Sequence, residues 1–380
     1  MKKKKIFISF ISVFISVAAS FLIFVSPFDF ADNDKTGVIN INYNTPYETP
    51  NDKRNIPFYN DDHTLNNSAR MKEYVYIVGK PIGIKLYCDG VIVVGTEKII
   101  TEKGEVSPAD IADIRCGDII KSVNGIKITS NASFCEMVNK SNGEDMNMVL
   151  IRGGEEINRV FNTVLSSDGG RYKAGLWIRD SSAGIGIMTF ITDNRHFSCL
   201  GHAVCDIDTD IVFPVADGNI TDAEITGIIK GDRGTAGELS GTLEKESIGK
   251  IYENGSCGIY GTVGKDFDIS NLKIFPVAKS DEVKVGKAQL ITSLENGKTE
   301  YFDIEITKTD CKESESKNFI IKITDENLIG KTGGIVQGMS GSPVIQNGFL
   351  IGAVTHVFLN DPTGGYGIYA ESMLEKTKEY

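Results

Sequence analysis

The stretch Gly338-Met339-Ser340-Gly341-Ser342-Pro343 flanks a Met-Ser pair with glycines and ends in Ser-Pro. It leads into the apolar residues 344–346, and an Asn-Gly dipeptide separates these from a returning apolar run at 349–356. Asn-Gly between apolar runs is a strong short-range signal for a β-hairpin. We therefore expect a tight serine turn that opens directly into a pair of strands.

The serine turn is suited to nucleophilic chemistry. A serine held between glycines projects its Oγ clear of the backbone, so Ser340 is the predicted nucleophile and Ser342 the competing one. The turn also lets the backbone N–H groups of Gly338 and Ser340 converge where a tetrahedral oxyanion would form, which predicts an oxyanion hole. A glycine-rich β-turn with surface serines is the alternative. With the hairpin included, the pattern resembles the nucleophile region of chymotrypsin-like serine proteases.

A nucleophilic serine needs a general base, and the chain has only four histidines. His202 lies among small residues in Leu200-Gly201-His202-Ala203-Val204, which leaves room for its ring to face a neighbour. His202 is therefore the predicted base and His196 the reserve. His63 lies in a polar segment, and His356, at the end of the returning strand, is either structural or lines the substrate site.

An acidic residue would orient the base and stabilise its charged form. Asp206, Asp208 and Asp210 follow His202 closely, and Asp325 lies a short way before Ser340. Each is also compatible with a solvated turn, and sequence spacing does not choose among them.

The cysteines and the net charge exclude other classes of function. Cys199 and Cys205 flank His202, but the seven cysteines include no Cys-x-x-Cys pair, which disfavours a zinc site and a disulfide framework. We therefore predict no metal and no cofactor. The net charge of −11 argues against a nucleic-acid partner, because phosphate binding needs a concentrated basic face.

Residues 73–164 form a compact block with strands expected at 75–78, 82–87 and 91–94 and a short helix near 133–139. The stretch Gly-Asp-x-Ile-x-x-Val-Asn-Gly at 117–125 resembles that of PDZ domains. Upstream, Pro81-Ile82-Gly83-Ile84 resembles the PDZ carboxylate-binding loop, which would make Ile82, Gly83 and Ile84 peptide-binding residues. The alternative is that Gly83 merely closes a hairpin.

The N-terminus carries an export signal. Four lysines at positions 2–5 precede an uncharged run from Ile6 to Val25, and about 20 apolar residues suffice to cross a bilayer as a helix. Because the lysines would stay cytoplasmic, the rest of the chain would be exported. We predict a membrane anchor at 1–25, with a cleaved signal peptide as the alternative, and a polar linker at 26–72.

Residues 172–380 contain many short apolar runs separated by turns. The whole chain has 40 glycines and only 10 prolines, a composition that favours strands over long helices. We expect a mostly β fold: a chymotrypsin-like β-barrel protease domain at 172–380, preceded by a PDZ domain and an N-terminal transmembrane helix. Helical periodicity is visible only near the C-terminus, at 371–378.

Several of these motifs together resemble the stage IV sporulation protein B family of sporulation peptidases. The likeness covers the anchor, the PDZ block and the C-terminal domain, and its most specific stretches are Leu200-Gly201-His202 with Asp206-x-Asp208-Thr209, residues 333–343, Thr355–Thr363, and Ile178-Arg179-Asp180-Ser181 with Ala183–Gly186.

The resemblance implies the catalytic residues His202, Asp325 and Ser340. It also implies self-cleavage and cleavage of a membrane-bound sporulation regulator, which releases an intramembrane metalloprotease to process a sigma factor. The protein would then sit in the inner forespore membrane and face the intermembrane space. The short gap from Asp325 to Ser340 departs from ordinary chymotrypsin-like enzymes, so the role of Asp325 rests on the resemblance. A non-catalytic PDZ adaptor with a protease-like fold is the alternative function.

Overall fold

The computed structural model describes residues 72–295, 297–312 and 314–379. The predicted anchor at 1–25 and nearly all of the predicted linker lie outside these residues. Within the described part of the chain, no helix combines the length and apolar character that crossing a bilayer requires.

Six strands pair in a closed cycle that forms a first ring. Five pairings run from β10 to β1, and the pairing of β1 with β10 closes the cycle. In spatial order they are β1 (Tyr74–Thr96), β10 (Leu176–Ile191), β11 (His196–Cys199), β14 (Gly258–Val263), β13 (Glu238–Gly255) and β12 (Asp217–Ile229). The short strand β15 (Lys273–Pro276) pairs with the start of β1. Buried apolar side chains such as Leu86, Phe197 and Ile220 form the core of this ring.

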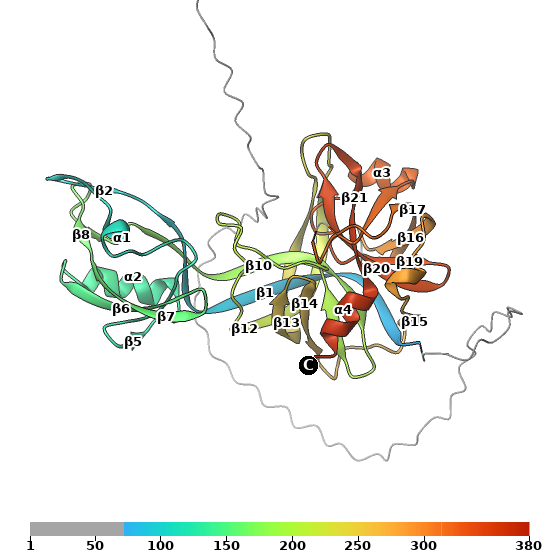
Figure 1. The fold of residues 1–380 in the computed structure, drawn as a ribbon, viewed down its shortest axis with the longest axis horizontal. Helices are drawn as coiled ribbons and strands as arrows, with labels where there is room; N and C mark the ends of the chain where they lie inside the picture. The colour runs from blue at the N-terminus through green and yellow to red at the C-terminus, as the bar shows by residue number, and fades with distance from the viewer. Residues whose placement is uncertain (1–71, 296, 313, 380) are drawn as a thin grey trace, which may run out of the picture. The chain divides into compact units, whose positions relative to one another are not determined.

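A second group of six strands forms a closed barrel (Figure 1). In spatial order these are β16 (Gly286–Thr292), β17 (Glu300–Lys308), β18 (Phe319–Ile323), β21 (Asp361–Tyr369), β20 (Phe349–Phe358) and β19 (Pro343–Gln346). The short 3-10 helix η1 (Ser280–Glu282) precedes the barrel, the helix α3 (Glu326–Thr332) follows β18, and α4 (Ala370–Thr377) ends the chain. The predicted barrel and C-terminal helix are thus confirmed.

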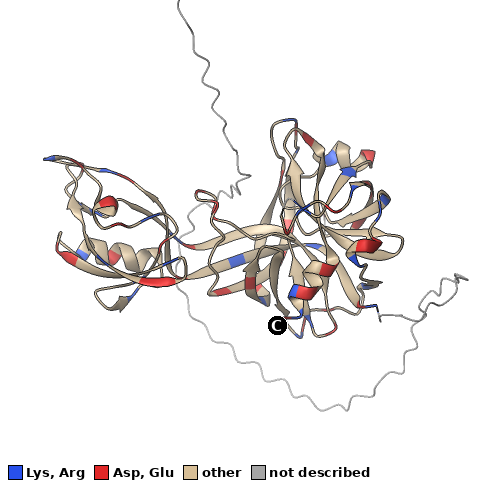
Figure 2. Cartoon of the chain, viewed as in Figure 1, with Lys and Arg blue, Asp and Glu red and all other residues tan. Residues whose placement is uncertain are grey.

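The two C-terminal helices carry charges that suit their dipoles (Figure 2). Each has an acidic residue in its first turn and a basic residue in its last, Glu326 and Lys331 in α3 and Glu371 and Lys376 in α4. This order stabilises a helix because its N-terminus carries partial positive charge and its C-terminus partial negative charge.

In sequence, the PDZ region lies between β1, the first strand of the ring, and β10, the second. It contains β2 (Ile99–Thr101), β3 (Gly104–Val106), α1 (Pro108–Ile111), β4 (Ile119–Val123), β5 (Ile126–Lys127), α2 (Asn131–Lys140), β6 (Asp145–Arg152), β7 (Glu155–Asn162), β8 (Val164–Leu165) and β9 (Tyr172–Lys173). Ser107 caps α1, because its side chain accepts a hydrogen bond from the Asp110 N–H. Buried side chains such as Val123, Phe134 and Leu150 form its core.

The structure contradicts the prediction of a carboxylate-binding loop at Ile82–Ile84. These residues lie inside β1, where the register pairs them with Gly184–Gly186 of β10 on one side and Ile220–Asp222 of β12 on the other. Their backbone groups are therefore engaged by two neighbouring strands, and Ile82 and Ile84 are buried in the first ring. Gly83 is small for a packing reason, because a Cβ there would lie 2.5 Å from the Thr221 hydroxyl.

The three strands expected at 75–78, 82–87 and 91–94 are one strand, β1, interrupted by irregularities in its pairing with β10. Its first half pairs with β12 and β15, and its second half pairs with β4 of the PDZ region. The PDZ region and the first ring therefore have β1 and β10 in common.

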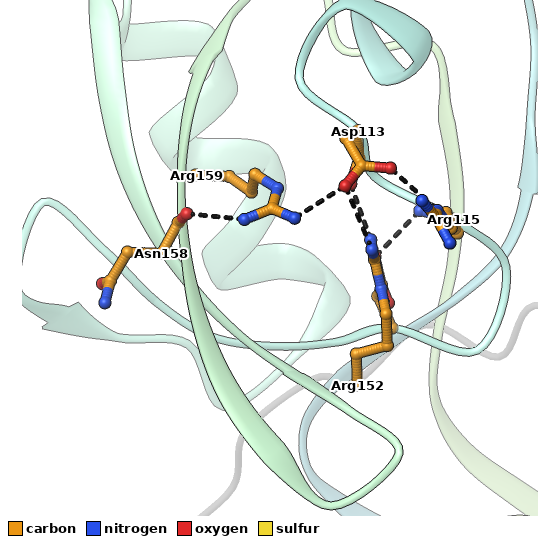
Figure 3. A network of polar contacts seen from close by, with 6 residues as sticks. Asp113, Arg115, Arg152, Asn158 and Arg159 are labelled. Atoms are coloured by element: carbon orange, nitrogen blue, oxygen red, sulfur yellow. Dashed lines mark hydrogen bonds and ion pairs between the residues drawn. The ribbon is translucent and has the colours of Figure 1, made fainter.

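The aspartate of the Gly-Asp motif, Asp118, belongs to an ionic network that also includes Asp113, and Figure 3 shows the contacts around Asp113. Asp118, which is 1% exposed, accepts two hydrogen bonds of 2.7 Å from the Arg152 guanidinium and one of 2.8 Å from the Arg115 N–H. Arg159, Arg115 and Arg152 all donate to Asp113, and these bonds hold the pKa of the Asp113 carboxyl well below its usual range. The network ties the loop before β4 to strands β6 and β7.

We expect Arg152→Ala to destabilise the PDZ region by about 3 kcal/mol, because it leaves the buried Asp118 carboxylate without its cation. Chemical unfolding followed by hydrogen exchange over residues 99–152 measures the loss. Arg115→Ala is the matched control: its side chain is 66% exposed and the bond from its backbone N–H to Asp118 survives the substitution. Equal destabilisation by both variants would contradict this account.

Candidate active site

Ser340 and His202 line the same cavity, which has a volume of about 400 Å³. His202 comes from the loop after β11 of the first ring, and Ser340 comes from the turn before β19 of the second. The structure thus brings the predicted nucleophile and the predicted base together. His196 lines a different cavity, with Lys72 and Leu374, so the prediction of His196 as the alternative base is wrong.

Backbone contacts with β10 hold the serine turn. The Ile187 N–H donates to the Ser340 carbonyl at 2.9 Å, and the Thr189 hydroxyl donates to the Gly341 carbonyl at 2.8 Å. Gly341 has a φ of +91°, and a Cβ there would lie 2.1 Å from the Ile187 carbonyl oxygen. Only glycine fits this position, which gives the sequence motif its physical reason.

The oxyanion-hole prediction agrees with the hydrogen bonding of the turn. The N–H groups of Met339, Gly341 and Ser342 each donate to a backbone carbonyl. Those of Gly338 and Ser340, by contrast, have no acceptor among the residues that the structure describes. Both residues line the cavity, so these two donors are available to a developing oxyanion. Ser342 is fully buried and does not line the cavity, which excludes it as the nucleophile.

His202 has the tautomer and charge that a general base needs. Its Nδ1 lies 2.8 Å from the Ala203 carbonyl oxygen, which can only accept, so Nδ1 carries the proton and the Nε2 lone pair remains free. Burial lowers the pKa of the His202 ring, and the bond to Ala203 opposes this shift without cancelling it. The ring is therefore neutral at pH 7 and able to accept the serine proton.

The serine hydroxyl is in a resting orientation. Ser340 Oγ donates to the Thr355 carbonyl of β20 at 2.9 Å rather than to His202. Proton transfer therefore requires the hydroxyl to rotate toward the imidazole. Catalytic hydrogen bonds commonly form in this way only when substrate is bound.

The structure contradicts the orienting role expected for Asp325. Its carboxylate caps the N-terminus of α3, accepting hydrogen bonds from the Asn327 and Leu328 N–H groups, and Asp325 does not line the cavity. An aspartate directly before a helix is a strong N-cap, and the helix needs these acceptors for its free N–H groups. The carboxylate is therefore committed to the helix.

Among the aspartates after His202, Asp206 holds the loop that carries the base. It is fully buried, pairs with Arg179 of β10, and accepts bonds from the Asp208 and Thr209 N–H groups. Arg179 also pairs with Asp208 at 2.7 Å. Nothing in the sequence singled out Arg179 as a partner of this loop. Burial raises the pKa values of the neighbouring Cys199 and Cys205, so both are thiols at neutral pH.

A serine that shares a cavity with a neutral histidine, with two free amides at the serine turn and a PDZ region in the same chain, defines a serine peptidase with a PDZ domain. The sequence model of the SpoIVB peptidase S55 family matches residues 170–374, and that of a PDZ domain matches residues 99–152. The chain belongs to the SpoIVB peptidase S55 family.

Two solved structures resemble the chain distantly. The inactive form of the Rv3671c protease shows 12% identity and a TM-score of 0.30 and covers 51% of this chain and 83% of its own. The active form, from M. tuberculosis, shows 13% identity and a TM-score of 0.29 and covers 52% and 74%. No curated protein matches the chain.

Gly341→Ala should disrupt the serine turn, because the new methyl group meets the Ile187 backbone in addition to the strain of a positive φ. We expect a loss of stability above about 2 kcal/mol together with loss of activity. Thermal unfolding and peptide cleavage measure both effects. Gly348→Ala is the matched control, since its φ is +80° and a Cβ there meets nothing within 4 Å. If Gly348→Ala were as damaging, strain alone would explain the glycine.

The lowered pKa of His202 predicts the pH below which the peptidase loses activity. A base whose pKa lies below the ordinary value of 6.5 stays neutral, and therefore active, as the pH falls through 6.5. The rate of peptide cleavage against pH should decline only below that value. A limb above pH 7 would contradict this reading, because it would require a carboxylate that raises the pKa of His202.

Proposed function

We propose that this peptidase is an exported endopeptidase of sporulation signalling that cleaves itself and a membrane-bound regulator. The cavity that Ser340 and His202 line together is the observation that carries the proposal, and family membership supports it. The two closed strand cycles, one supplying the base and the other the nucleophile, support a chymotrypsin-like arrangement of two barrels.

The reaction would follow acyl transfer through a covalent intermediate. His202 Nε2 takes the Ser340 proton as Oγ attacks the scissile carbonyl, and the Gly338 and Ser340 amides hold the oxyanion. The imidazolium then gives its proton to the leaving amine, which departs as the acyl-enzyme forms. Water attacks the ester with His202 as base and frees the second product. The scheme uses no metal and no cofactor.

The N-terminal sequence and the family support a proposal for the site of action. We propose that residues 1–25 anchor the chain in the inner forespore membrane, with the peptidase facing the intermembrane space. Residues 26–72 would contain the self-cleavage site, because a polar linker is accessible to a protease. Cleavage of the membrane-bound regulator would release an intramembrane metalloprotease that processes a sigma factor.

The PDZ domain would deliver peptides from the same chain and from partners. PDZ domains bind an extended peptide by adding it to a sheet edge. Because Ile82–Ile84 have both neighbours occupied, the peptide would dock on another edge of this region.

Expression of residues 26–380 tests the proposal when the chain is followed over time on a denaturing gel. The parent should fragment at discrete sites, whereas Ser340→Ala should remain intact, because it lacks the nucleophile. Ser342→Ala is the matched control and should fragment like the parent. Equal fragmentation of the parent and Ser340→Ala would indicate a contaminating protease, and an intact, folded parent would contradict self-cleavage.

A further inference from the structure

The catalytic histidine has a second histidine beside it. His356 of β20 lines the cavity with His202 and Ser340, and the ring centroids of the two histidines lie 5.0 Å apart at an interplanar angle of 43°. From the sequence, His356 is either structural or lines the substrate site, and its place in the cavity agrees with the second alternative. Asp325, which caps α3, is not among the residues that line this cavity.

Strand β20 aims His356 at this position. Its pairing with β21 has irregularities between Val354 and His356 and again between Val357 and Phe358, so a break in register lies on each side of the histidine. Such irregularities turn a side chain away from the regular alternation of a strand and are common beside active sites. The preceding residue, Thr355, provides the carbonyl that receives the Ser340 hydroxyl. One short segment therefore contacts both the nucleophile and the base.

His356 is a neutral, polar ring with spare hydrogen-bonding capacity. Burial, with smaller contributions from His202 and Lys317, lowers the pKa of His356 to about 3. Its Nδ1 is buried and has no hydrogen-bond partner among the described residues. A buried nitrogen without a partner costs free energy in the resting protein and calls for an explanation.

The other charged groups that line the cavity are less suited to support the base. Asp206 is committed to Arg179 and to its own turn, Asp210 is exposed, and Lys317 carries the same charge as an imidazolium. Tyr366 also lines the cavity, and Lys317 lies over its ring.

We propose that His356 is a positioning residue that holds the His202 ring and stabilises its imidazolium during acyl transfer. The Ala203 carbonyl sets the tautomer of His202, and the neutral His356 ring supplies an uncharged, dipolar neighbour when that ring takes the serine proton. Together they do what one carboxylate does in a Ser-His-Asp triad. The inference rests on Ser340 and His202 as nucleophile and base.

The full chain in detergent, treated with a fluorophosphonate probe, tests the proposal without a known peptide substrate. The probe reacts with the activated serine, so its labelling rate reports on the nucleophile and base alone. We expect His356→Phe, which keeps a flat ring but loses both nitrogens, to lower the rate about 100-fold. His356→Gln keeps a polar side chain, so it should be labelled at least about tenfold faster than His356→Phe.

The pH dependence separates positioning from a structural role. Without His356 the imidazolium is less stable, so the acid limb of labelling should move to lower pH in His356→Phe, while the concentration dependence for the probe stays unchanged. His196→Phe is the matched control, since His196 lies outside this cavity and should label like the parent. Thermal unfolding confirms that each variant is folded.

Three outcomes would overturn the proposal. Labelling of His356→Phe at the parent rate would show that the ring nitrogens are not used. An unchanged acid limb in a slow variant would assign His356 to packing. If His356→Phe does not fold, a His356→Gln chain that folds but labels no faster than Ser340→Ala would equally contradict the polar role.

Discussion

One residue of β10, Ile187, connects the two parts of the active site through its backbone, and the catalytic arrangement depends on it. Ile187 donates its N–H to the Ser340 carbonyl at 2.9 Å, and its own carbonyl accepts from the Leu200 N–H at 3.4 Å, two residues before His202. The nucleophile turn and the base loop come from different strand cycles, so nothing in their own sequences fixes their separation. The close approach that links them requires glycine at position 341, where a Cβ would lie 2.1 Å from the Ile187 carbonyl oxygen.

The same strand carries the site's connection to the PDZ region. The first half of β10 pairs with the end of β1, which also pairs with β4 of that region, and Arg179 extends from it to the loop that follows His202. Breaking a buried ion pair leaves an uncompensated charge, so the loop and the strand resist moving apart. Catalytic geometry and peptide-binding region are thus built on common strands rather than on separate domains joined by a linker.

The parts of the site that could be predicted from sequence are those with a local signature. The serine turn can be recognised by its glycines, which the close packing requires. His202 can be recognised by its small neighbours. Asp325 and Ile82–Ile84 were misassigned because their roles depend on what folds against them: a helix that needs a cap, and two strands that pair with β1. An aspartate directly before Glu326 could have been recognised as a helix N-cap. The orientation of His356 depends on irregular strand pairing, which leaves no readable pattern in the sequence.

A crystal structure of the fluorophosphonate adduct tests the central claim, that Ser340, His202 and two amides act on one point. The account predicts phosphorus bonded to Ser340 Oγ, the phosphoryl oxygen about 2.7–3.1 Å from the Gly338 and Ser340 nitrogens, and His202 Nε2 facing the adduct. An adduct on another residue, or a phosphoryl oxygen turned away from both amides, would contradict it.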